Sequence, residues 1–167
     1  MGNGNRGNIM IIKNGLVFTP EGKFEKKDLY VEGEYVAKET TDNKEVEAEG
    51  CYVIPGLVDI HFHGCVRHDM CDGTEESIQA LADYEAANGV LAICPATMTI
   101  PEEELFQAMK AAKEHKNGKG ADLVGINMEG PFISPAKKGA QAAENIMHCD
   151  YEYFSRLQKA ANGLIKL

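Results

Sequence analysis

The chain has 167 residues, of which 44% are hydrophobic, and it carries a formal net charge of −9. This length and hydrophobic content are sufficient for a packed core. The acidic balance argues against nucleic acid or an anionic membrane as a partner, because both would repel it. No apolar run approaches the ~20 residues of a membrane span, and the N-terminus does not resemble a signal peptide.

The first third of the sequence predicts a small β-domain. Residues 1–9 are rich in Gly and Asn and predict a disordered leader. Over residues 10–54, turn signals separate short strands. The predicted strands are Ile9–Phe18, with a hairpin turn at Asn14-Gly15, then Asp28–Val31, Glu34–Ala37 and Val46–Ile54. Further turns are predicted at Thr19–Gly22 and at Glu32-Gly33, the latter as a second hairpin.

From residue 55 the pattern changes to strands that alternate with helices. The strands are predicted at Leu57–His63, Val90–Pro95 and Leu123–Met128, with a fourth beginning at Leu164–Leu167. The helices are predicted from Thr74 to Asn88, from Pro101 to Asn117 and from Asp150 to Ala161. The first strand is so apolar that we expect it to be buried on both faces. The alternation predicts an α/β fold with a parallel sheet, and a doubly wound sheet and a (β/α)8 barrel both fit it.

Two histidines end the first of these strands. His61 and His63 are two residues apart, so on an extended backbone their side chains point to the same side. Two imidazoles projected together from a strand end form half of a metal site. The alternative is that each is a core residue with its own hydrogen-bond partner.

A carboxylate ends the third strand. Glu129 follows Leu123–Met128, and Gly130-Pro131 turns the backbone away from it. Barrel enzymes collect their chemical groups at such carboxyl ends of strands. A lone Glu is by default a solvated surface residue, so its sequence context has to decide.

That context resembles a known family. The segment 55–64, PGLVDIHFHG, looks like the first barrel strand of the amidohydrolase superfamily of metal-dependent hydrolases. The segment 127–134, NMEGPFIS, followed by KKGAQ at 137–141, is similar to the N-acetylglucosamine-6-phosphate deacetylase family. Most amidohydrolases use a carbamylated Lys as bridging ligand, so a Glu in this context is discriminating. The resemblance runs from about Met10 to Leu167.

The resemblance implies a fold and a set of site residues. It implies the first three to four units of a (β/α)8 barrel over 55–167, preceded by part of a small β-sandwich domain over 10–54 and the leader 1–9. It implies that His61, His63 and Glu129 are metal ligands, and that Ala140 and Gln141 contact the sugar. The histidine pair favours a site able to hold two metal ions, because family members that lack it hold one.

The resemblance also implies a reaction. A divalent metal, which could be Zn, Fe, Mn or Co, would assist hydrolysis of the N-acetyl amide of N-acetylglucosamine 6-phosphate, a sugar phosphate, to glucosamine 6-phosphate and acetate. The family's general acid/base Asp and two further His ligands are expected downstream of Leu167, so this chain holds no catalytic proton shuttle and is expected to be an inactive fragment by itself. The parent enzyme is expected to be a cytoplasmic homo-oligomer, a dimer.

Several alternatives stay open at this point. The parent could be another amidohydrolase, dihydroorotase-like or deaminase-like, or the chain could be a non-catalytic fragment. Cys65 could serve as a third ligand beside the histidines, although an ordinary buried thiol is the commoner case. Lys137 and Lys138 could attract the phosphate, although loop lysines are usually solvated. The remaining site-type residues, His68 and His148, are expected in loops or on the surface. The five cysteines are odd in number and none is paired in a CxxC motif, which is typical of reduced thiols in the cytoplasm.

Overall fold

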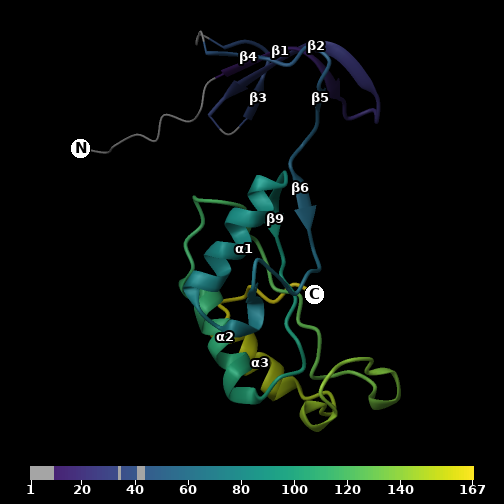
Figure 1. The fold of residues 1–167 in the computed structure, drawn as a ribbon, viewed down its shortest axis with the longest axis vertical. Coiled ribbons are helices and arrows are strands. Elements are labelled where there is room, and N and C mark those ends of the chain that lie inside the picture. The colour runs from purple at the N-terminus through teal and green to yellow at the C-terminus, as the bar shows by residue number, and fades with distance from the viewer. Residues whose placement is uncertain (1–9, 34, 41–43) are drawn as a thin grey trace, which may run out of the picture. The chain divides into compact units, whose positions relative to one another are not determined.

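The computed structural model describes residues 10–33, 35–40 and 44–167. It divides into two compact units, Met1–Pro55 and Gly56–Leu167. Figure 1 shows that the first unit is built from strands and the second from strands and helices. The predicted leader and the first residue of the predicted strand Ile9–Phe18 lie outside the described residues.

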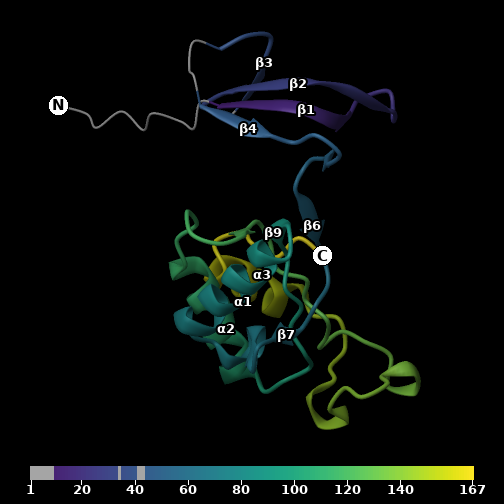
Figure 2. The ribbon, with the colours of Figure 1, turned by 45° about the horizontal axis from the view of Figure 1, so that its top comes forward.

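The first unit is a five-stranded sheet. It contains β1 (Met10–Phe18), β2 (Phe24–Glu32), β3 (Tyr35–Ala37), β4 (Glu45–Glu47) and β5 (Tyr52–Val53). The strand order is β3-β2-β1-β4, and β5 also pairs with β1. The long antiparallel pair of β1 and β2 is prominent in Figure 2. Both β4 and β5 run parallel to β1, so the residues predicted as one strand over Val46–Ile54 form two short ones.

The hairpin predicted at Asn14-Gly15 is wrong, because β1 passes through these residues as one strand. Asn14 has φ +61°, and the register against β2 shifts between Ile12 and Gly15, which is the behaviour of a β-bulge. The Asn14 N–H, freed from the ladder, donates to Asp28 Oδ1 at 2.9 Å. The chain reverses instead at the predicted turn Thr19–Gly22, where the Thr19 N–H donates to Lys23 O. The second predicted hairpin is confirmed by the antiparallel pairing of β2 with β3.

The second unit has a parallel sheet. It contains β6 (Leu57–Asp59), β9 (Val90–Ile93) and β10 (Asp122–Leu123), in the order β10-β9-β6. Beyond these strands, single parallel bridges join Ala96 to Asn127 and Ile126 to Ile165. The predicted strands are therefore present, but shorter than expected. The predicted loop 64–73 contains a small antiparallel pair, β7 (Gly64–Cys65) and β8 (His68–Asp69), which the sequence analysis missed.

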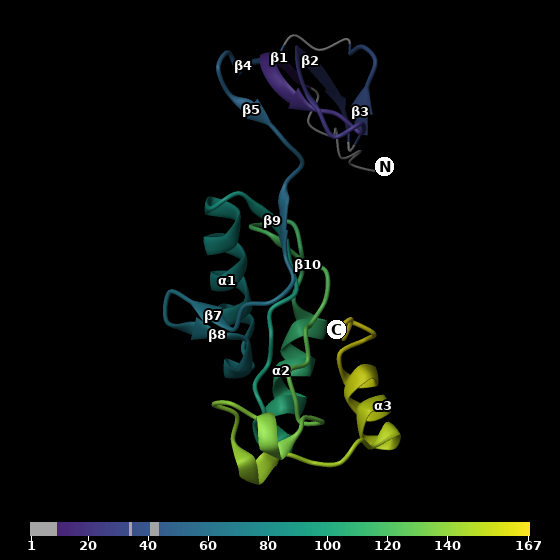
Figure 3. The same ribbon diagram turned by 90° about the vertical axis from the view of Figure 1, so that its right-hand side faces the viewer.

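Three helices confirm the predicted ones. They are α1 (Glu75–Ala87), α2 (Glu102–Glu114) and α3 (Tyr151–Ala160). Thr74 and Asp150 cap α1 and α3 through their side chains, whereas Pro101 precedes α2 without a side-chain cap. Short 3-10 turns lie at Met70–Asp72 (η1), Pro135–Lys137 (η2) and Ala143–Asn145 (η3). Figure 3 shows α2 between α1 and α3, in agreement with their contacts.

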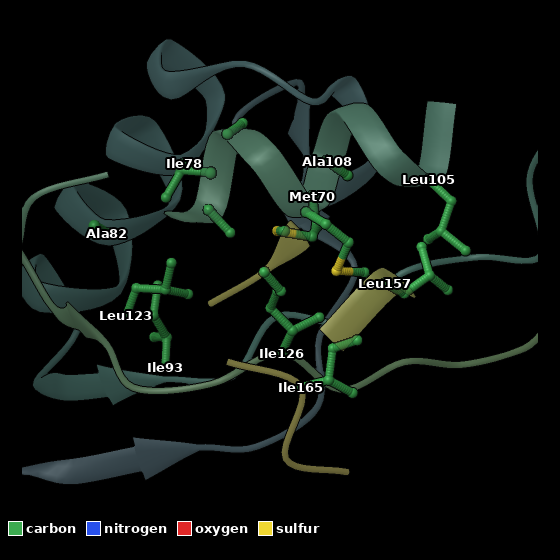
Figure 4. Close-up of a cluster of buried hydrophobic side chains, with 14 of the residues drawn as sticks. Met70, Ile78, Ala82, Ile93, Leu105, Ala108, Leu123, Ile126, Leu157 and Ile165 are labelled. Carbon is green, nitrogen blue, oxygen red and sulfur yellow. The ribbon is translucent and has the colours of Figure 1, made fainter. Parts of the chain in front are cut away.

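The core of the second unit lies between the sheet and the helices (Figure 4). All three helices contribute to one cluster of buried side chains. The larger members labelled in Figure 4 are Met70, Ile78, Ile93, Leu105, Leu123, Ile126, Leu157 and Ile165. Among the described residues, no helix combines the length and the apolar character that a membrane span requires.

The first strand of this sheet is not buried on both faces, which corrects the prediction for Leu57–His63. Leu57, Val58 and Ile60 are 50%, 59% and 55% exposed. The run of apolar residues over Leu57–His63 is typical of a strand that is covered on both faces. Because consecutive strand residues point to opposite faces, the exposure of both Leu57 and Val58 shows that neither face of β6, an edge strand of this sheet, is fully covered.

Candidate metal centre

The two histidines lie just beyond β6, where the backbone remains extended enough to keep them together. The His61 N–H donates to Asp59 Oδ1 at 2.9 Å, which holds the chain as it leaves the strand. The two imidazole rings have centroids 5.2 Å apart and planes at 85° to each other. The prediction that the two side chains project together is therefore confirmed.

Glu129, which lies beyond the carboxyl end of β10, contacts both of these histidines. Its Oε2 lies 3.4 Å from His61 Nε2 and 3.1 Å from His63 Nε2. One donor atom from each of the three residues lies within 4.8 Å of the others, so that they could share a metal ion. His63 and Glu129 are about one-third exposed and His61 about half, which leaves the group open to solvent.

One oxygen of Glu129 is occupied by a neighbour. Gln141 Nε2 donates to Glu129 Oε1 at 2.7 Å, while Oε2 faces the imidazoles. Gln141 is buried, and its own Oε1 accepts from the Thr99 N–H at 2.6 Å. The carboxylate is thus oriented from one side and offers its other oxygen to the site.

The Nδ1 atom of His61 lies next to the side chain of Asn127. Asn127 Nδ2 donates to Ile60 O at 2.9 Å and lies 3.1 Å from His61 Nδ1. Because the carbonyl can only accept, the amide nitrogen must face it, and His61 Nδ1 then accepts as well. In this arrangement the His61 proton is on Nε2, pointing at Glu129.

The donor set fits a divalent transition metal. Two imidazole nitrogens and one carboxylate oxygen are the ligand types that Zn, Fe, Mn and Co accept. His63 Nδ1 is buried and, among the described residues, has no hydrogen-bond partner. A ring with one orphaned nitrogen and the other directed at a carboxylate is not explained as an ordinary core histidine. The residues present therefore fit the group that the sequence analysis expected.

The other candidates lie outside this group. Cys65 is not part of it, and burial, followed by the charge of Glu85, raises the pKa of its thiol. His68 Nδ1 lies 3.0 Å from Ser77 Oγ, in the network that caps α1, and His148 is exposed. His148 is therefore a surface residue, as predicted, whereas His68 is half-buried and belongs to β8, which corrects the prediction for it.

The loop expected to contact the sugar is only partly accessible. Ala140 is exposed, but Gln141 is buried. Lys138 Nζ donates to the carbonyls of Gly139 and Gln141, so it ties the loop together, whereas Lys137 is exposed. Two amides touch the site. Asn127, beside His61, was not expected from the sequence, and Gln141 was expected to contact the sugar rather than Glu129. The only signal for them was their position close to Glu129 in the sequence.

Comparison with known proteins gives a consistent result. The chain is 33% identical over 163 residues to the N-acetylglucosamine-6-phosphate deacetylase of Bacillus subtilis, covering 94% of this chain and 40% of that protein. It is 28% identical over 137 residues to the N-acetylgalactosamine-6-phosphate deacetylase of Escherichia coli O157:H7, covering 80% of this chain and 36% of that protein. No protein-family model matches the chain.

A solved structure shares the fold. The chain superposes on the crystal structure of N-acetylglucosamine-6-phosphate deacetylase from Pasteurella multocida with a TM-score of 0.82 at 20% identity, covering 95% of this chain and 43% of that one. The likeness at this identity concerns the fold, which is α/β.

The relatives are enzymes of the amidohydrolase superfamily. Among them, the chain is similar to the N-terminal part of the N-acetylglucosamine-6-phosphate deacetylases. It spans about 40% of the length of the curated relatives that it matches first.

Proposed function

We propose that this chain supplies the metal-binding N-terminal part of an amino-sugar-phosphate deacetylase. The reaction is hydrolysis of the N-acetyl amide of N-acetylglucosamine 6-phosphate to glucosamine 6-phosphate and acetate. The observation that carries the proposal is the convergence of His61, His63 and Glu129 beyond the carboxyl ends of β6 and β10, two strands of one parallel sheet that are separated by β9. The names of the relatives supply the substrate class.

We propose that residues 55–167 are the first units of a (β/α)8 barrel. Two observations support a barrel over a doubly wound sheet. Each strand pairs with the one before it, through β6, β9, β10 and the bridge from Ile126 to Ile165. All three helices contribute to one buried cluster, whereas a doubly wound sheet reverses its strand order and carries helices on both faces.

We propose that residues 10–54 are part of a β-sandwich. An apolar hollow of about 510 Å³ lies on this unit, as expected where a second sheet would pack. It is lined by residues that include Val17, Leu29, Val36 and Val53.

The donor atoms indicate which residue would bind the metal through which atom. His61 and His63 would hold a divalent metal through nitrogen and Glu129 through Oε2. When bound, such a metal supplies Lewis-acid polarisation of an amide carbonyl and activation of water at neutral pH. We assign the lining of the sugar site to the exposed Ala140, because Gln141 is buried and both of its backbone polar groups are hydrogen-bonded to Lys138. The resemblance assigns the proton transfer from water to the leaving amine to an Asp expected downstream of Leu167.

The proposal also covers the cellular location and the oligomeric state of the parent protein. All five cysteines are free thiols, which supports a reducing, cytoplasmic location. We propose a homo-oligomeric parent, with a sugar phosphate as its small-molecule partner.

A chimera tests the function. The chain replaces the matching 163 residues of the Bacillus subtilis relative, and acetate release from N-acetylglucosamine 6-phosphate is measured with Zn, Fe, Mn or Co added. We expect metal-dependent turnover that falls at least ~100-fold in Glu129→Gln. The isolated chain, with and without chelator, is the negative control. N-acetylgalactosamine 6-phosphate in the same assay decides between the two hexosamine substrates.

Two outcomes would contradict the proposal. One is a chimera that melts cooperatively and binds metal but releases no acetate from either sugar phosphate. The other is a Glu129→Gln chimera whose turnover stays within about twofold of the parent, because a ligand cannot be lost without a large effect.

A further inference from the structure

Gln141 occupies an unusual position for a residue of a sugar-contacting loop. It is only 4% exposed, and both ends of its carboxamide are bound within the protein. Its Oε1 accepts from the Thr99 N–H at 2.6 Å, and its Nε2 donates to Glu129 Oε1 at 2.7 Å. The carboxamide therefore has little capacity left for a ligand.

The orientation of this carboxamide is determined by its partners. A backbone N–H can only donate, so the atom facing Thr99 must be the amide oxygen. A carboxylate can only accept, so the atom facing Glu129 must be the amide nitrogen. A flipped amide would set donor against donor at Thr99 and acceptor against acceptor at Glu129, and would lose both bonds.

The bond has a consequence for the carboxylate. A hydrogen bond to an ionised acceptor is stronger than one between neutral groups, and 2.7 Å is short for such a pair. It fixes Oε1 of Glu129 and leaves Oε2 between His61 Nε2 and His63 Nε2. Partners of this kind, which bind a ligand rather than the metal, commonly decide how well a site holds its ion.

The Gln141 side chain is itself anchored to the segment that follows β9. Thr99 lies shortly after β9 and is buried, so its N–H is a fixed point. The loop is tied to the same residue a second time, because Asn145 Nδ2 donates to Thr99 O at 3.3 Å. Gln141 thus connects Thr99, in the segment after β9, to the candidate ligand Glu129, in the segment after β10.

We propose that Gln141 is a positioning residue for the metal ligand Glu129, acting through its carboxamide rather than through contact with substrate. This inference rests on the proposed function, since it takes Glu129 as a ligand. It predicts that metal affinity depends on the hydrogen-bonding capacity of residue 141. If Gln141 only held the loop in place, metal affinity would depend on whether the loop is ordered and not on the hydrogen bond to Glu129.

The test is Co²⁺ binding to the 167-residue chain, followed by calorimetric titration and by the visible spectrum of the ion. Gln141→Met has similar length but neither donor nor acceptor, and we expect its dissociation constant to rise about 10- to 100-fold, with an altered spectrum. Asn145→Ala is the matched control, because it removes the other tie to Thr99 without touching Glu129. We expect its affinity to stay within about twofold of the parent.

A second variant keeps the test decidable if Gln141→Met does not fold. Gln141→Glu retains the acceptor for the Thr99 N–H but replaces the donor to Glu129 with a like charge. We expect its dissociation constant to change at least about tenfold, with an altered Co²⁺ spectrum. Parent-like binding and spectrum in either Gln141 variant would overturn the inference, as would an equal loss of affinity in Asn145→Ala.

Failure of the inference is separable from failure of the metal site. Glu129→Ala and His63→Ala are titrated in the same series. If they bind Co²⁺ as the parent does, the metal centre itself is refuted. If they lose the ion while the Gln141 variants keep it, only the positioning role is refuted.

Discussion

Gly130 packs directly against Thr99, next to the candidate ligand Glu129. A Cβ on Gly130 would overlap Thr99 Oγ1, and the Gly130 φ of +82° is one that other residues rarely adopt. We expect Gly130→Ala to lower the free energy of unfolding by about 2–5 kcal/mol, from backbone strain and overlap together. Denaturant unfolding of the chain measures the change.

Gly139 is the matched control for this prediction. Its φ is +60°, but no atom lies within 4 Å of the position of an added Cβ. Gly139→Ala should therefore cost only the strain, about 1–2 kcal/mol. Equal losses in the two variants would show that the contact with Thr99 is unimportant.

Cys71 is predicted to be an unreactive thiol. Burial raises its pKa from the ordinary 9.0 to about 12, the charge of Asp69 adds to the rise, and the Met98 N–H, which donates to its sulfur, opposes it. At pH 8 the thiolate, which is the reactive form, is about one part in 10⁴. Iodoacetamide at pH 8 should label the exposed Cys51 and Cys149 and leave Cys71 unlabelled, as followed by peptide mass spectrometry.

The sign of the pH dependence follows from the raised pKa. The labelling rate of Cys71 should increase about tenfold for each pH unit up to about 12. Denatured chain, in which all five cysteines should react, is the control. Labelling of native Cys71 at the rate of Cys149 would contradict the prediction.

At the residue scale the sequence predicted the meeting of three side chains, but not their neighbours. The pairing of His61 and His63 follows from backbone periodicity, whereas the meeting of Glu129 with them was implied by the family resemblance. The bond from Gln141 to Glu129 depends on the path of an irregular loop. No periodicity governs that path, so the residue was interpreted as a substrate contact instead.

Among the elements, α1 depends on a cap that can be tested. Thr74 Oγ1 accepts from the Ser77 N–H at 3.1 Å and donates to Ser77 Oγ at 2.9 Å. We expect Thr74→Ala to lower the unfolding free energy by about 1 kcal/mol, because a helix N–H loses its acceptor. Thermal and denaturant unfolding monitored by circular dichroism measure this change.

Thr74→Ser is the control, because it keeps the hydroxyl. It should stay within about 0.5 kcal/mol of the parent, since Ser caps helices at least as well as Thr. A Ser variant as unstable as the Ala variant would attribute the effect to the lost methyl group.

The elements were predicted with uneven success for physical reasons. The helices were found because caps and apolar spacing are local properties of the sequence. The turn at Asn14-Gly15 was wrong because those residues also suit the left-handed backbone of a bulge, and only the partner strand decides between the two. The exposure of β6 was missed because an apolar run does not reveal how many of its faces are covered.

For the whole molecule, exposed apolar residues of the second unit's sheet predict association. Val58 and Val124 are 59% and 44% exposed. Both lie on the face opposite to the buried Ile93 and Leu123, according to the strand register. We expect the 167-residue chain to self-associate as its concentration rises, since such a face gains by burial against a second copy. Light scattering coupled to gel filtration measures the mass.

Charged substitutions provide the control for association. Val58→Lys combined with Val124→Lys should reduce the mass toward that of a monomer. Tyr84→Lys, at an exposed position on α1, should leave the association unchanged. A parent chain that stays monomeric at all concentrations would refute the prediction.

The strand order of the second unit bears on how the chain folds during its synthesis. β6 pairs with β9, β9 with β10, and the segment after β10 with Ile165, so each strand pairs with the one made just before it. A strand that leaves the ribosome finds its partner already present. In the first unit, by contrast, β4 and β5 both pair with β1 rather than with the strand made just before them. The sheet that carries the histidines can therefore grow one strand at a time, and Glu129 joins them as soon as the third strand docks.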